Sequence, residues 1–386
     1  MMTTPCSRRR FLGTVGATAG MLAVRPMSFL ASTPPAGRVA VGMCHSYGPA
    51  VTTSLATLFD QLGGMEKLVR GKTVAMKINL TGNPDMRLNY IPIGNTTWVH
   101  PDVIGATVHL LSKAGAARIR ILESPWNTTE PLEEFMLKAN WEPRDFMSAG
   151  TKVEFENTNY LGYGKSYARF MVPHGGLMFT GYDLNHSYRD CDVFVSIAKL
   201  KEHMTAGVTL TMKNCFGMTP CTIYGEGSPK DEPGLAPAGG RGPFHYGNRL
   251  PSKGVPPPVN FEVAKTKDGG YRVPRVVADI VAARPIHLGI IDGIETINKT
   301  EGPWGPGCKY IKPGLLIAGT NCVNTDAVGM ALMGFDPMAD RGTPPFETAD
   351  STLRLAESLG VGTRDLKQIE VVGTPIEKGR FNFRSA

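Results

Sequence analysis

Short apolar runs alternate with longer amphipathic stretches along most of the chain. The runs are rich in Val, Ile and Leu, as buried strands are, and the stretches repeat apolar residues every three or four positions, as helices do. Strands that alternate with helices indicate an α/β fold, with a mostly parallel sheet and helices on both faces. The predicted strands cover residues 38–44, 73–80, 117–124, 190–200, 285–293, 313–319 and 368–373, and the predicted helices cover residues 53–64, 100–116, 132–140, 274–285, 324–334 and 348–360.

A long insertion rich in Gly and Pro, residues 217–272, interrupts this alternation. A loop of that length within a domain is usually a functional lid or a disordered insertion. Because it contains Tyr224, His245, Tyr246 and Arg249, we favour a lid. We expect the α/β domain to span residues 38–340. Residues 341–386 then complete it with a final helix and strand.

The first 31 residues have the order of regions found in an export signal. Paired Arg8 and Arg9 precede Phe11 and Leu12, a Gly- and Ala-rich apolar segment follows, and the pattern resembles a twin-arginine signal. A basic tail with a small amphipathic helix is the alternative. The signal predicts the twin-arginine export machinery as a partner and a periplasmic or other extracytoplasmic location. Apolar residues 12–24 are shorter than the roughly 20 residues of a membrane-spanning helix, so no stable membrane span is expected.

Net charge and cysteine spacing narrow the function classes further. The formal net charge is +7, from 41 Lys and Arg against 34 Asp and Glu, but the first 31 residues hold four arginines and no acid, which leaves +3 for the rest. Without a basic run, nucleic acid is not an expected partner. The seven cysteines include no C-x-x-C pair, so a ferredoxin-type iron–sulfur motif is absent from the sequence. A metal site built on His203, Cys215 and Cys221 stays open as an alternative.

Polar side chains collect where the predicted strands end. Strand parity places Lys199, Lys201 and His203 on one face, and a spacing of four residues puts Thr209 and Lys213 on one helical stripe. Ligands of open α/β sheets bind outside the carboxyl ends of the strands, so we expect a pocket there. The other residues predicted for it are Lys77, Asn79, Glu123, Asn214, Asp292, Asp326, which follows the strand at 313–319, and His100, for which a helix N-cap role is equally compatible.

These residue types favour a pocket for an anion. Lysines hold carboxylates or phosphates, and a histidine exchanges a proton near neutral pH. We expect His203, Lys213 and Lys201 to be catalytic and the remaining residues to bind a small anionic ligand. The cofactor is unknown, with an anionic organic cofactor or a metal both compatible. A ligand-binding protein or cofactor carrier without catalysis is the alternative function.

A family resemblance accompanies these residues. The segments VAMKINL, WVHPDVIGATVHLLSKAGA followed by ILES, IAKLKEHMTAGVTLTMKNCFG, IIDGIE, EGPWGPG and CVNTDAVGMALMG resemble the domain-of-unknown-function family 362, over about residues 38–340. Many relatives resemble fusions with a ferredoxin module, and no such module is expected in this chain. A looser likeness to nickel-pincer racemases implies redox or racemase-like chemistry. The family pattern matches Lys77, His100, Lys199, Lys201, His203, Lys213, Asn214, Asp292, Gly302, Pro303 and Asp326.

Overall fold

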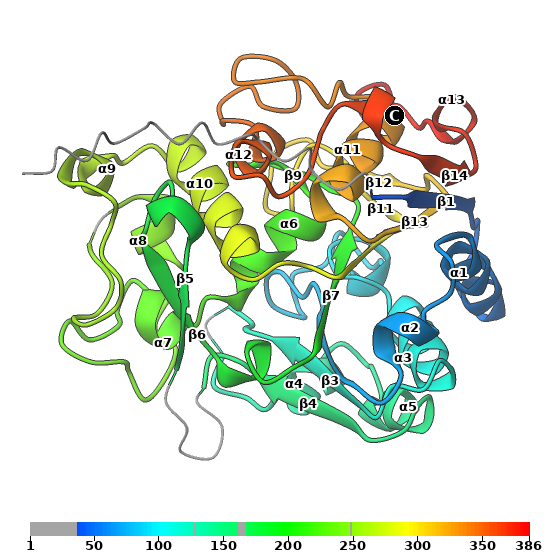
Figure 1. The fold of residues 1–386 in the computed structure, drawn as a ribbon, viewed down its shortest axis with the longest axis horizontal. Helices are drawn as coiled ribbons and strands as arrows, with labels where there is room; N and C mark the ends of the chain where they lie inside the picture. The colour runs from blue at the N-terminus through cyan, green and yellow to red at the C-terminus, as the bar shows by residue number, and fades with distance from the viewer. Residues whose placement is uncertain (1–36, 127, 161–166, 248) are drawn as a thin grey trace, which may run out of the picture. The chain divides into compact units, whose positions relative to one another are not determined.

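An eight-stranded sheet forms the centre of the fold in the computed structural model, which describes residues 37–126, 128–160, 167–247 and 249–386 (Figure 1). The predicted α/β class is confirmed, whereas the predicted export signal, residues 1–31, lies outside the described residues. Across the sheet the strands follow the order β14 (Val371–Gly373), β1 (Val39–Met43), β13 (Leu315–Gly319), β10 (Leu288–Gly293), β7 (Val193–Lys199), β2 (Thr73–Lys77), β3 (Arg118–Glu123) and β4 (Val153–Asn157).

All pairings in this sheet are parallel except those of β13, which runs antiparallel to both β1 and β10. The carboxyl ends of β2, β3, β7 and β10 therefore meet at one edge, where Asp292 pairs with Lys199. The chain after β13 starts from the opposite edge. The sequence argument that placed Asp326 at the carboxyl edge, through the strand at 313–319, was wrong for this reason.

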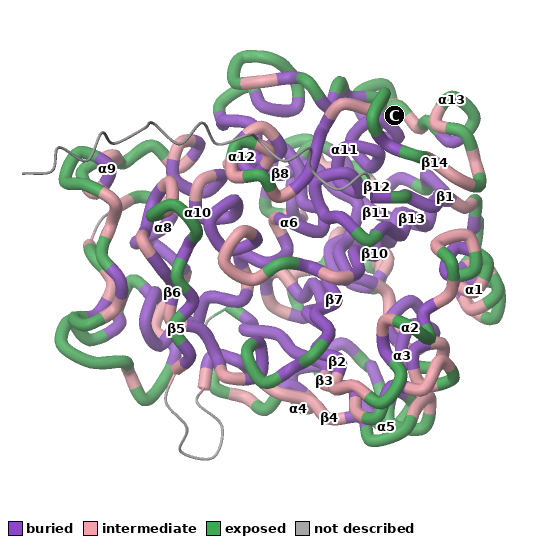
Figure 2. Tube along the Cα trace, in the orientation of Figure 1, coloured by how far each residue is buried: buried purple, intermediate pink, exposed green. Residues whose placement is uncertain are grey.

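Helices cover both faces of the sheet, and most residues of its central strands are buried (Figure 2). Side chains along these strands alternate between two apolar cores. On β7, Val193 and Val195 enter one core and Phe194 enters the other. The first face is covered by α1 (Pro49–Gln61), α3 (Pro101–Lys113), α4 (Leu132–Leu137) and α5 (Pro143–Ser148). The second is covered by α6 (Thr211–Asn214), α10 (Gly269–Ala283), α11 (Cys322–Leu332) and α12 (Thr352–Ser358).

Two helix starts show how local sequence sets the element bounds. Helix α3 begins where predicted, with Pro101 in the first turn and His100 Nδ1 accepting the Asp102 N–H at 3.1 Å. Helix α10 begins five residues before the predicted start at Pro274, because Asp268 caps it by accepting the Gly270 N–H at 2.9 Å.

The smaller elements lie mainly in the irregular segments. Among the described residues, no helix has the length and apolar character needed to cross a membrane. The remaining elements are α2 (Glu66–Val69), η1 (Ile93–Asn95), β5 (Ala168–Met171), η2 (Pro173–Gly175), β6 (Gly181–Leu184), η3 (His186–Tyr188), β8 (Lys201–His203), β9 (Gly207–Thr209), η4 (Cys215–Met218), α7 (Cys221–Tyr224), α8 (Gly242–His245), α9 (Phe261–Lys265), β11 (Thr296–Ile297), β12 (Tyr310–Ile311), η5 (Leu366–Gln368) and α13 (Ile376–Gly379).

The segment after β7 differs from the predicted arrangement. The strand stops at Lys199, and β8 and β9 form a separate hairpin in which Lys201 pairs with Thr209. The helix then covers only residues 211–214. The predicted helical stripe that joined Thr209 to Lys213 was therefore wrong, although Thr209 at the end of the hairpin and Lys213 in α6 both line the same cavity.

Candidate functional site

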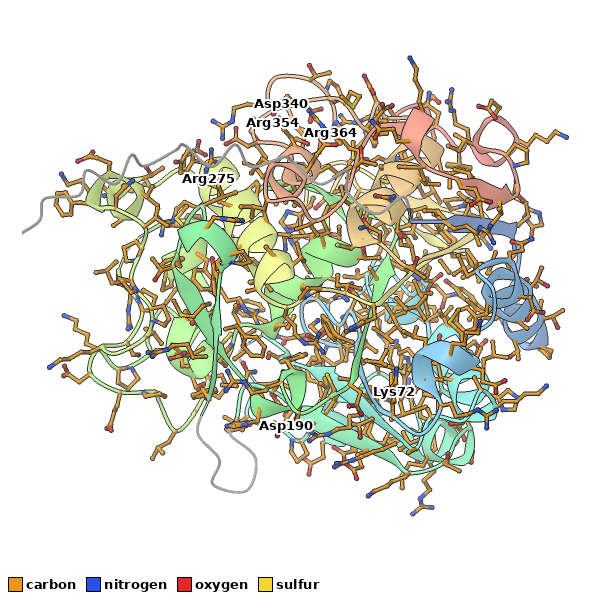
Figure 3. All side chains as sticks on the ribbon, viewed as in Figure 1. Lys72, Asp190, Arg275, Asp340, Arg354 and Arg364 are labelled. Atoms are coloured by element: carbon orange, nitrogen blue, oxygen red, sulfur yellow. The ribbon has the colours of Figure 1, made fainter. Side chains whose placement is uncertain are left out.

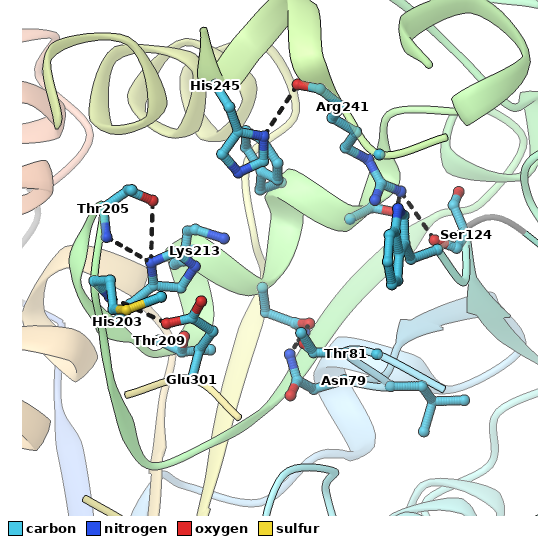
Figure 4. A pocket seen from close by; sticks show the side chains of 18 of the residues that line it. Asn79, Thr81, Ser124, His203, Thr205, Thr209, Lys213, Arg241, His245 and Glu301 are labelled. Atoms are coloured by element: carbon cyan, nitrogen blue, oxygen red, sulfur yellow. Dashed lines mark hydrogen bonds between the residues drawn. The ribbon is translucent and has the colours of Figure 1, made fainter. Parts of the chain in front are cut away.

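A cavity of about 520 Å³ opens beside the carboxyl ends of β2 and β3 (Figure 4). Its walls also include the β8–β9 hairpin, α6 with the turn after it, part of the insertion and the loop that begins at Glu301. This volume suits a small organic molecule. The predicted site residues that line it are Lys77, Asn79, Glu123, His203, Thr209, Lys213 and Asn214.

Lys77 and Glu123 form a buried ion pair in the cavity wall. The Lys77 Nζ lies 2.6 Å from Glu123 Oε1 and also donates to the Ile78 carbonyl at 2.6 Å and to Asn214 Oδ1 at 3.1 Å. Burial lowers the pKa of Lys77, and Glu123 opposes that shift. Because three acceptors already surround this ammonium, Lys77 holds the wall together and offers no free donor to an anion.

The amide of Asn79 leaves a buried acceptor without a partner. Asn214 Nδ2 donates to the carbonyls of Lys77 and Ile197, each at 3.1 Å, so Asn214 Oδ1 must accept from Asn79 Nδ2 at 3.1 Å. Asn79 Oδ1 then has no partner among the described residues, and neither does the buried Thr209 Oγ1. Both residues line the cavity, so these two atoms are available to a polar ligand placed there.

Lys213 is a cation of the cavity that lacks a partner. Its Nζ lies 4.4 Å from the centre of the Phe216 ring and makes no hydrogen bond or ion pair within the part of the chain that the structure describes. Burial lowers the pKa of Lys213 to about 7; Glu301 raises it, and Arg241 and Lys77 lower it further. An anion placed here would restore the charged form of Lys213.

His203 is a buried imidazole whose hydrogen bond fixes its tautomer. Its Nδ1 accepts the Thr205 N–H at 3.1 Å, so the neutral ring carries its proton on Nε2 (Figure 4). Burial, followed by the charge of Lys213, lowers the pKa of His203 well below the usual value. His203 is therefore a neutral hydrogen-bond donor at neutral pH, whereas the sequence predicted that it exchanges a proton there.

His245 has the opposite hydrogen-bonding function. Its Nδ1 lies 3.0 Å from the Arg241 carbonyl, which can only accept, so Nδ1 carries the proton and Nε2 is an acceptor with no hydrogen-bond partner in the described ranges. The ring packs edge to face on Phe216, with centroids 5.1 Å apart. Burial and then Lys213 lower the pKa of His245 to about 4. The cavity thus contains one imidazole that donates and one that accepts.

Glu301 and Arg241 complete the charged lining. Glu301 accepts the Met204 N–H and the Trp304 indole N–H, each at 3.1 Å. Burial raises the pKa of Glu301, but His203 and these donors lower it more, to about 2, so it stays ionised. Arg241 donates from Nη2 to the Ser124 carbonyl at 2.9 Å, which ties the insertion to the end of β3.

Lys199, Asp292 and His100 form a separate cluster that does not line the cavity. The Lys199 Nζ lies 2.8 Å from Asp292 Oδ2 and 3.0 Å from the Tyr47 hydroxyl. His100 stacks on Tyr47, with ring centroids 3.5 Å apart, and its backbone N–H donates to Asp292. These contacts join the ends of β7 and β10 to the start of α3, which is a structural role.

Lys201 and Asp326 are also outside the cavity lining, although both support it. Lys201 Nζ donates to the carbonyls of Thr97 at 2.7 Å and Glu301 at 2.9 Å, so this predicted catalytic lysine connects two loops. Asp326 accepts the N–H groups of Thr211 and Met212, both at 2.9 Å, at the start of α6. Asp326 therefore positions the helix that carries Lys213.

The alternative metal site finds no matching geometry. Within the described ranges, no three His, Cys, Asp or Glu side chains gather as metal ligands would. Cys215 and Cys221 are buried free thiols, and neither lines the cavity that contains His203. The donors present suit an organic anion better than a metal.

Sequence reasoning did not select some residues of the cavity, among them Arg241, Glu301, Trp126 and Trp304. His245 was noted only as part of the insertion. Available signals were the position of Trp126, three residues after the Glu123 that ends β3, and the EGPWGPG segment. In that segment the side chains of Glu301 and Trp304 line the cavity.

Two known proteins are similar to parts of the chain. The chain is 29% identical over 180 residues to a thylakoid-associated protein, sll1697, of Synechocystis sp., with 44% of this chain and 47% of that protein covered. The chain thus spans about half the length of this curated relative. A crystal structure of a Thermotoga maritima protein is similar at a TM-score of 0.34 and 15% identity, over 66% of this chain and 52% of the other.

The family match covers the whole candidate site. Residues 74–331 match the family described as "Domain of unknown function (DUF362)", and all residues that line the cavity fall between Lys77 and Trp304. The chain therefore belongs to the DUF362 family.

Proposed function

We propose that this chain is an enzyme that binds a small anionic substrate or cofactor in the cavity and moves a proton to or from the bound molecule. The observation that carries the proposal is the Lys213 ammonium, which has no hydrogen-bond or ion-pair partner among the described residues, together with two buried imidazoles of opposite hydrogen-bonding function. A carboxylate or phosphate at Lys213 gives this cation its counter-charge and accepts a hydrogen bond from the Thr209 hydroxyl.

The two histidines divide the proton chemistry. His245 Nε2 accepts a proton from the bound molecule, and His203 Nε2–H donates a hydrogen bond to an oxygen that gains negative charge. An anion beside Lys213 offsets the cation that lowers the pKa of His245, so ligand binding strengthens this base. Proton transfer of this kind serves the racemase-like or redox chemistry expected from the sequence.

A carrier without catalysis is the competing function, and the His245 acceptor argues against it, because a binding site for an anion gains nothing from an unprotonated base. We also propose that the protein acts after twin-arginine export, in the periplasm or another extracytoplasmic space. The export proposal rests on residues 1–31 alone.

Calorimetric titration with sulfate tests the anion site. Wild type should bind one sulfate, and Lys213→Met should bind it at least about tenfold more weakly, as expected when a cation close to an anion is lost. Lys72→Met is the matched control, because Lys72 is also half-buried but does not line the cavity (Figure 3). Equal affinity in wild type and Lys213→Met would exclude the proposed site.

Deuterium incorporation separates the enzyme from the carrier. Wild type in D₂O, offered a panel of α-hydroxy and α-amino carboxylates, should place deuterium on carbon in at least one of them. His245→Gln should retain sulfate binding and lose this exchange. Exchange at the same rate in His245→Gln would remove this residue from the proton-transfer role, and binding without exchange in wild type across the panel would favour the carrier.

A further inference from the structure

The tryptophans of the chain are distributed in an unusual way. Of the four, Trp98 and Trp141 are buried in the core, whereas Trp126 and Trp304 are 38% and 44% exposed. Both half-exposed tryptophans line the cavity that contains Lys213. Large exposed aromatic surface beside a polar cavity is typical of a binding site, because a ligand removes that surface from water.

Glycines hold both indoles close to the backbone. A Cβ atom at Gly302 would lie 2.2 Å from Trp304 Cη2, and one at Gly82 would lie 2.8 Å from Trp304 Cζ3. A Cβ atom at Gly240 would lie 3.0 Å from Trp126 Nε1. The Trp304 indole is also fixed by its hydrogen bond to Glu301. Both rings are therefore pre-oriented surfaces of the wall, which lowers the entropy lost when a ligand binds.

We propose that the ligand is an aromatic or heteroaromatic anion whose carboxylate or phosphate meets Lys213 and whose ring stacks on Trp126 or Trp304. This inference rests on the proposed function, since it names the substrate class of the same site. Flat π systems gain more from an indole face than saturated rings of similar size do. Met86 and Met204 also line the cavity, and thioethers pack well on aromatic rings.

The buried acceptor at Asn79 refines the ligand class. Asn79 Oδ1 has no partner among the described residues, and its orientation is fixed through Asn214. A ring hydroxyl or ring N–H would supply the missing donor. The favoured ligand is therefore an aryl or heteroaryl acid that also carries such a donor, and 4-hydroxybenzoate is a simple probe of that class.

A matched pair of ligands tests the aromatic preference. Wild type is titrated with benzoate and with cyclohexanecarboxylate, which share the carboxylate and ring size and differ in aromaticity. Benzoate should bind about tenfold more tightly, the gain expected from aromatic stacking. In the Trp126→Leu/Trp304→Leu double variant the ratio should fall to about one. Phe261→Leu, which changes an exposed aromatic residue away from the cavity, should retain the wild-type ratio.

The outcomes separate this inference from the function on which it rests. Sulfate binding that depends on Lys213, combined with equal affinity for the two ring acids in wild type, would overturn the aromatic preference alone. Failure of every anion to bind would overturn the proposed function and the preference together. Because the ligand pair is compared first on wild type, a double variant that does not fold leaves that comparison intact.

Discussion

The Lys77 ammonium lies 2.6 Å from the Glu123 carboxylate, and the two side chains are only 1% and 4% exposed. Removing one partner of such a pair leaves a buried charge uncompensated, which costs about 3–5 kcal/mol. We therefore expect Glu123→Gln to lower the free energy of unfolding by about that amount in urea denaturation.

An exposed ion pair provides the control for this prediction. Arg354 and Asp340 lie 2.6 Å apart with side chains 43% and 42% exposed (Figure 3). Loss of Arg354 should cost no more than about 1 kcal/mol, because water screens such pairs. Similar costs for Glu123→Gln and Arg354→Met would contradict the structural role of the Lys77–Glu123 pair.

Sulfate affinity should depend on pH through Lys213. Burial lowers the pKa of this lysine to about 7, so its ammonium is present below that pH and is lost above it. Affinity should therefore fall with rising pH, by about tenfold per pH unit once the amine is neutral. His203 and His245 lose their charge at lower pH, since burial lowers the pKa of both.

Lys213→Arg is the variant that isolates this effect. A guanidinium stays charged throughout the neutral range. The sulfate affinity of Lys213→Arg should therefore stay constant between pH 6 and pH 9, whereas that of wild type should fall. Calorimetry at several pH values measures both curves. A wild-type affinity that is flat over this range would assign anion binding to a group other than Lys213.

The tautomers of the two histidines are a direct consequence of their hydrogen bonds. We expect ¹⁵N NMR to find the proton of His203 on Nε2 and that of His245 on Nδ1. Because the folded protein resists protonating His245 until about pH 4, stability should be complete above the ordinary histidine pKa of about 6.5 and decline below it. His245→Gln should reduce that decline. The same tautomer at both histidines would contradict the division of roles.

Asp326 should influence anion binding although it does not touch the cavity. Its carboxylate accepts the first N–H groups of α6, so Asp326→Asn should cost about 1–3 kcal/mol and weaken sulfate binding by misplacing Lys213. Asp365→Asn, at an exposed cap where the Lys367 N–H donates at 3.0 Å, should change neither. Loss of stability with unchanged sulfate affinity would show that α6 keeps Lys213 in place without Asp326.

Export is tested on the segment outside the described residues. Replacing Arg8 and Arg9 with lysines should leave the protein on the cytoplasmic side, because the paired arginines are the recognised feature of this signal. Cell fractionation with an antibody against the folded domain measures this. Unchanged export of the Arg8→Lys/Arg9→Lys variant would rule out the twin-arginine route.

The sheet and much of the cavity could be predicted because they follow simple periodicities. Apolar runs located seven of the eight sheet strands, and the polar residues at the ends of β2 and β3 do line the cavity. β4 escaped because it reads VEFEN, an edge strand whose glutamates pair with Arg118 and Arg120 of β3. Alternation of polar and apolar residues with charges is a weaker signal than a buried run.

The remaining errors have physical causes that parity could not capture. Lys199 and Lys201 separate because the strand ends between them and the hairpin turns the chain. β13 is reversed because β10 and β13 are connected without a crossover helix, and parallel neighbours usually need one. His245 and Arg241 come from the insertion, where no periodic pattern assigns a direction to a side chain.

The anion site at Lys213 is tested most directly by measuring the pKa of the Lys213 side chain. NMR of protein with ¹³C-labelled lysine gives this pKa, and comparison with Lys213→Arg assigns the signal. A value near 7 is expected in the free protein. Saturating sulfate should raise it by more than about one pH unit, because an anion that binds the ammonium must favour its charged form. A Lys213 pKa that sulfate leaves unchanged would contradict the anion site on which the proposed function depends.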